Sequence, residues 1–108
     1  MEQLTTRKCV PCHSQMPRLA NDRALELLKQ APEWRLFDNK LWRTFTLPTF
    51  PSAIQFVNRM AEIAEAEGHH PIITIRFNQV DVQIWTHAIN GLSDNDFILA
   101  AKFNTIPR

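Results

Sequence analysis

The sequence has no large excess of charge, few glycines and no long hydrophobic run. Its 108 residues include 12 lysines and arginines against 11 aspartates and glutamates, interspersed along the chain, so we expect no basic face for direct nucleic-acid binding. Only two glycines exclude a fibrous glycine repeat, and 44% hydrophobic with 21% charged residues is typical of a globular domain. No apolar stretch approaches the roughly 20 residues that cross a bilayer, and residues 1–8 lack the apolar segment of a secretory signal. We therefore expect a cytoplasmic protein that does not bind membranes.

Cysteine is also scarce, and both cysteines lie in the run Cys9-Val10-Pro11-Cys12-His13. The run matches the C-x-x-C-H pattern of covalent haem attachment, but such haem needs an exported apoprotein and a large pocket. A zinc site needs a fourth ligand, and no nearby residue offers one. We expect two reduced thiols in an irregular N-terminal arm over residues 1–18.

Residues 19–108 are predicted to form one domain that begins with a short helix and a β-hairpin. The helix is expected after a cap at Asn21 or Asp22 and to end near Ala31, because Pro32 blocks its continuation. Alternating side chains predict strands over 34–38 and 41–47, joined by a turn at 38–40.

A second helix, hairpin and third helix follow. Ser52 is expected to cap a helix over 52–67 that Gly68 terminates. Strands are predicted over 72–77 and 80–87, and Ser93 with Asp96 forms a capping pattern for the last helix. The order α-β-β-α-β-β-α predicts an α+β domain in which helices cover one face of a four-stranded antiparallel sheet.

The apolar residues of helix 52–67 cover more than one stripe. A helix with so wide an apolar arc normally contacts both its own sheet and a second subunit. We expect a homodimer or homotetramer, formed through this helix and an edge strand.

Three histidines are expected to converge on one end of the second hairpin. His69 and His70 precede the first of its strands and His87 ends the second, and antiparallel pairing makes a strand's start a neighbour of its partner's end. Alternation places the aliphatic side chains of strand 80–87 in the core and His87 on the opposite face, with Trp85. Imidazole exchanges protons near neutral pH, so the group is a candidate acid–base site.

These residues resemble the pterin-4a-carbinolamine dehydratases. That family has an acidic residue, a His-His-Pro motif, an aromatic residue, a further histidine and an aspartate in the following helix. The resemblance covers residues 19–103, and the arm is similar to an extension of many bacterial members. The matching positions here are Glu65, His69, His70, Pro71, Phe77, His87 and Asp96.

The resemblance implies dehydration of 4a-hydroxytetrahydrobiopterin to quinonoid dihydropterin, a step that recycles the cofactor of aromatic amino acid hydroxylases. It implies acid–base roles for His69, His70 and His87, without a metal or organic cofactor. Supporting or substrate-binding roles are implied for Glu65, Pro71, Thr86 and Asp96. The chain has Gly68 where some members have an acid and Asn95 where some have an arginine, which bears on substrate positioning more than on the reaction type.

Other interpretations of the same residues remain open. His69 and His70 could be cations at a helix end, Asp96 could serve only the capping box, and Pro71 could only block the helix. The fold could act as a dimerisation or coactivator module that binds a transcription factor through its second helix. A metal site is a further alternative, although adjacent residues on a strand point to opposite faces. Which histidine is the acid, and which pterin is used, stay undecided.

Overall fold

The computed structural model describes residues 3–108, and within them the chain forms one four-stranded sheet with three α-helices. The α-helices and strands follow the predicted order α-β-β-α-β-β-α, which confirms the α+β class. Two short 3-10 helices, one in the arm and one after the last strand, add to this pattern. The elements are η1 (Leu4–Thr6), α1 (Asn21–Leu28), β1 (Arg35–Phe37), β2 (Lys40–Thr46), α2 (Phe50–Glu67), β3 (Ile72–Arg76), β4 (Gln79–Ile84), η2 (His87–Ile89) and α3 (Asp94–Phe103).

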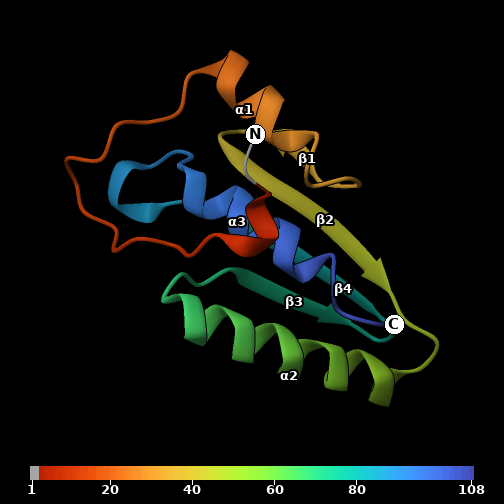
Figure 1. The fold of residues 1–108 in the computed structure, drawn as a ribbon. Coiled ribbons are helices and arrows are strands. Elements are labelled where there is room, and N and C mark those ends of the chain that lie inside the picture. The colour runs from red at the N-terminus through yellow and green to blue at the C-terminus, as the bar shows by residue number, and fades with distance from the viewer. Residues whose placement is uncertain (1–2) are drawn as a thin grey trace.

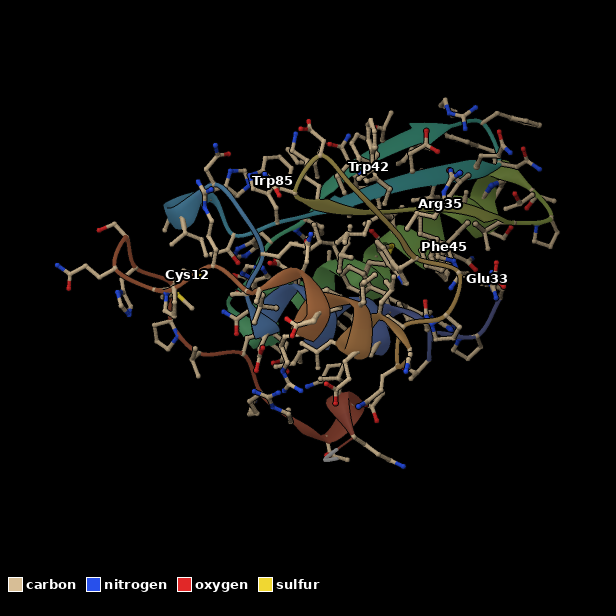
Figure 2. The ribbon with its side chains drawn as sticks, turned by 90° about the horizontal axis from the view of Figure 1, so that it is seen from above. Cys12, Glu33, Arg35, Trp42, Phe45 and Trp85 are labelled. Atoms are coloured by element: carbon tan, nitrogen blue, oxygen red, sulfur yellow. The ribbon has the colours of Figure 1, made fainter. Side chains whose placement is uncertain are left out.

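The sheet is antiparallel, with strand order β1-β2-β4-β3 and the helices on one face (Figure 1). Alternation along β4 buries Val80, Val82 and Ile84 on the helix side, as predicted. In β2, Phe45 joins this core by pairing with Val80, whereas Trp42 pairs with Gln83 on the opposite face (Figure 2). The core is therefore a single layer of apolar side chains between the sheet and the helices.

Several predicted boundaries were wrong by a few residues. Helix α2 begins at Phe50 with Thr49 as its N-cap, because Pro51 is well suited to a first helical turn and Ser52 is the third helical residue, completing a capping box. Helix α1 has Ala20 at its N-cap rather than Asn21 or Asp22, and the cap makes no side-chain hydrogen bond. Gly68, with φ of 66°, ends α2 in the left-handed conformation, as expected.

The arm is fastened to the domain along much of its length. Leu4 is buried in the core, and Arg7 forms an ion pair with Asp94 at the start of α3. The arm then loops around the segment that contains η2 (Figure 1), where Arg18 Nε donates to the carbonyl of Ile89. Of the helices in residues 3–108, none is both long and apolar enough to span a bilayer.

Candidate active site

One cleft of about 240 Å³ brings the three predicted histidines together. It lies where α2 passes into β3 and β4 passes into η2, which is the end of the hairpin at which the sequence placed them. Gly68 makes this possible, because its left-handed conformation turns the chain sharply after α2. The cleft is lined by Cys12, Gly68, His69, His70, His87 and Ala88.

His69 is the buried member of the group, with 5% of its side chain exposed. Its Nε2 lies 2.6 Å from Oδ1 of Asp96, a fully buried carboxylate on α3. The other oxygen of Asp96 accepts hydrogen bonds from the Ser93 amide, at 2.9 Å, and from the Thr86 hydroxyl, at 2.9 Å. Asp96 therefore both completes the capping box of α3 and orients His69, so the two interpretations of this residue are compatible.

This network assigns the proton of neutral His69. An ionised carboxylate only accepts hydrogen bonds, so the Nε2 atom must carry hydrogen and donate it to Asp96. The remaining nitrogen, Nδ1, then carries the lone pair, and its neighbour at 3.5 Å is the sulfur of Cys12. A buried aspartate holds a reactive imidazole in one tautomer in the same way in serine-protease triads.

His70 and His87 are exposed and held more loosely. His70 Nε2 lies 2.8 Å from Oε1 of Glu65, and both side chains face solvent. His87 is the first residue of η2, not the end of β4 as predicted, because the strand stops at Ile84. Its ring stacks against Trp85 with centroids 4.1 Å apart, and Lys40 Nζ lies 4.4 Å from the centroid of the Trp85 ring. Both imidazoles are exposed beside the cleft, and each is contacted by one neighbouring side chain.

The other predicted site residues do not line the cleft. Glu65 and Asp96 act on it through His70 and His69, and Thr86 is fully buried beneath Asp96. Pro71 links His70 to the start of β3. Phe77, which matches the resemblance pattern, lies at the opposite end of β3 and is 73% exposed.

Sequence reasoning missed two residues, Cys12 and Asn95. Cys12 belongs to the arm and lines the cleft, and the buried Asn95 side chain lies within 3.5 Å of the Cys12 sulfur. The available signals were the C-x-x-C-H run and the departure from arginine at position 95, but neither gave a position in space. Within residues 3–108, no three histidine, cysteine, aspartate or glutamate side chains are grouped to hold a metal ion.

Comparisons with known proteins agree on one family. A family model described as pterin 4 alpha carbinolamine dehydratase matches residues 17–106. A Chlorobaculum tepidum protein is 43% identical over 106 residues, covering 94% of this chain and 96% of that protein. The Arabidopsis thaliana mitochondrial pterin-4-alpha-carbinolamine dehydratase 2 is 42% identical over 98% of this chain and 60% of its own length.

A solved structure agrees with these sequence matches. The crystal structure of a transcriptional coactivator/pterin dehydratase from Brucella melitensis has a TM-score of 0.77 and 32% identity, covering 82% of this chain and 96% of that one. The chain therefore belongs to the pterin-4a-carbinolamine dehydratase family.

Proposed function

We propose that this protein dehydrates a 4a-hydroxytetrahydropterin to the quinonoid dihydropterin and water. The observation that carries the proposal is the meeting of three imidazoles at one cleft, one of them buried against a carboxylate and two of them exposed. Family membership and the name of the Arabidopsis relative support the same reaction. A coactivator or dimerisation role, such as the name of the Brucella protein includes, gives no reason for three imidazoles to converge.

The reaction needs an acid and a base but no electron carrier. The C4a–O bond breaks as an acid protonates the hydroxyl, which leaves as water. A base removes the N5 proton, and the electron pair of the N5–H bond forms the C4a=N5 double bond. His69, through Nδ1, together with His70 and His87, is proposed to supply both functions, while Glu65 and Asp96 orient the rings.

Turnover of synthetic 4a-hydroxytetrahydropterin, alone and coupled to an aromatic amino acid hydroxylase, tests the proposal. We expect His69→Ala, His70→Ala and His87→Ala each to lower kcat/KM, by about a hundredfold or more where the imidazole transfers a proton in the transition state. His13→Ala is the matched control, because His13 lies on the exposed part of the arm and does not line the cleft. Full activity in the double variant His70→Ala, His87→Ala, with an unchanged circular dichroism spectrum, contradicts the assignment.

We also propose that the protein works as a homodimer or homotetramer in the reducing cytoplasm. The oligomer is supported by a second apolar stripe on α2, in addition to the stripe that packs in the core. The compartment is supported by Cys9 and Cys12, which are both free thiols.

A further inference from the structure

Hydrogen bonds with buried side chains hold the arm against the site. Asn95, at the start of α3, is 1% exposed, and its side-chain amide hydrogen-bonds both the N–H and the C=O of Val10 in the arm. Its Oδ1 accepts from the Val10 amide at 2.9 Å, and its Nδ2 donates to the Val10 carbonyl at 2.7 Å. An arginine at position 95 has no acceptor and could not make the first of these bonds. The departure from arginine therefore coincides with the docking of the arm.

A second anchor lies one residue earlier in the arm. The Cys9 amide donates to Oε1 of Glu67 at 2.8 Å, and Oε2 of Glu67 accepts from Lys102 at 2.7 Å. The Cys9 thiol faces the Asn95 carbonyl at 3.6 Å. Burial, together with the nearby Glu67 carboxylate, raises the pKa of Cys9 to about 12, so this thiol stays protonated, and the anchor is the Cys9 amide, which a substitution of the side chain leaves in place.

These two anchors place Cys12 at the cleft. Its sulfur accepts from Nδ2 of Asn95 at 3.5 Å and lies 3.5 Å from Nδ1 of His69. Because Nδ1 of neutral His69 carries a lone pair, the Cys12 S–H is the group that donates to it. A thiol is a weak donor, so a substrate N–H or O–H can displace it from Nδ1 at little cost.

We propose that Cys12 is a positioning residue that holds the His69 ring with Nδ1, the nitrogen not bound by Asp96, facing the cleft, which makes the N-terminal arm part of the active site. The inference rests on the proposed function in taking Nδ1 as a proton-transferring atom. Asp96 holds one side of the ring and Cys12 the other, and the thiol occupies the place that a substrate proton would take.

The test compares Cys12→Ala and Cys12→Ser with the matched control Cys9→Ser in the full-length protein. The ¹⁵N chemical shift of His69 Nδ1 reports the hydrogen bond from the thiol, and kcat/KM for the carbinolamine reports its use. In Cys12→Ala we expect the Nδ1 shift to change while the Nε2–H tautomer set by Asp96 is kept, and kcat/KM to fall by less than about tenfold, the upper range of a single hydrogen bond. Cys12→Ser keeps a donor and should recover part of both effects, whereas Cys9→Ser should change neither.

The two readouts separate failure of this inference from failure of the proposed function. If Cys12→Ala matches Cys9→Ser in the His69 ring shifts, the positioning role is overturned, whatever the activity. If no form of the protein turns over the pterin but Cys12→Ala still changes the ring shifts, the contact stands and the proposed function fails. Because Cys12 is exposed, its variants are expected to fold as the unaltered protein does.

Discussion

The three histidines of the cleft differ in how firmly the protein holds them. His69 is buried and contacted at both nitrogens, whereas His70 and His87 are exposed and contacted on one side. A ring fixed on two sides needs no reorganisation when a substrate arrives, which favours proton transfer in a defined direction. The exposed rings can adjust to a flat heterocycle as it enters. The site thus combines one preorganised imidazole with two adaptable ones.

The two cysteines should differ sharply in reactivity. With a pKa of about 12, the thiolate fraction of Cys9 at pH 8 is about one part in ten thousand, whereas Cys12 is exposed at the cleft. We expect iodoacetamide at pH 8 to modify Cys12 first, as read by peptide mass spectrometry over time. Carbinolamine turnover should fall in step with Cys12 labelling, because the added group enters the cleft. Labelling of Cys9 at an equal rate in the folded protein would contradict this expectation.

The sequence predicted that the three histidines meet, but it did not predict that Cys12 of the arm lines the same cleft. The gathering of His69, His70 and His87 follows from hairpin geometry, which depends only on local pairing. The contact of Cys12 with His69 spans 57 positions, and that of Asn95 with Val10 spans 85. No periodic pattern in residues 1–18 encodes such docking, since it depends on side chains of other elements.

Among the elements, the end of α2 links three parts of the structure. Glu67 is the last residue of the helix, and its carboxylate contacts Lys102 of α3 and the amide of Cys9 in the arm. Burial alone would raise the pKa of Glu67, but hydrogen bonds from Lys102 and Cys9 outweigh it and lower the pKa below the ordinary value of 4.5. The helix, the arm and α3 therefore share one largely buried carboxylate.

The stability of the protein should depend on this carboxylate below about pH 5. Because the folded pKa is lowered, its contribution is fully present above the unfolded value of 4.5 and is lost as pH falls through the folded value. Glu67→Gln should lower the free energy of unfolding at pH 7 by about 1–3 kcal/mol and flatten its decline in acid, as measured by urea denaturation at several pH values. Glu62→Gln, an exposed position on the same helix, should leave both unchanged. Equal slopes in acid for Glu67→Gln and the unaltered protein would refute the linkage.

Element boundaries were predicted less well than element types. The predicted cap of α2, Ser52, is instead its third helical residue, because Thr49 caps the helix and proline is well accommodated in the first turn. The predicted strand 80–87 is too long at its end, because alternation continues through Trp85 but pairing of β4 with β2 and β3 does not. The last residue of β4 in the β2 ladder is Ile84, which pairs with Leu41. Pairing partners, not propensity, set where a strand ends.

For the molecule as a whole, the two hairpins and the buried face of the sheet followed from patterning. Period-two alternation in β2 and β4 defined the core side, and hairpin turns joined neighbouring strands. Asp38 and Asn39 turn with φ of 55° and 56°, as a two-residue hairpin requires. No local pattern indicates that β2 and β4 are the central strands, because their pairing brings together segments that α2 and β3 separate in the chain.

We expect copies of the chain to assemble into an oligomer through α2 and the edge strand β3. Ala53, Phe56, Met60 and Ala64 of α2 pack in the core. A second apolar stripe at helical spacing includes the exposed Phe50 and the half-buried Ile54 and Val57. At the sheet edge, β3 leaves Ile72 and Ile75 partly exposed as well. Apolar surface of this extent on both a helix and an edge strand favours contact between copies.

Analytical ultracentrifugation at micromolar concentration should therefore detect a dimer or tetramer. Ile54→Glu places an unpaired charge in the proposed interface and should weaken association by about tenfold or more, without unfolding the domain, because Ile54 is half-buried and, unlike Val57, is not packed against the core. Gln55→Glu is the control, since it adds the same charge at an exposed position of α2 outside the stripe. A monomer at all concentrations, or equal association of the two variants, would show that the second stripe of α2 does not join copies of this chain.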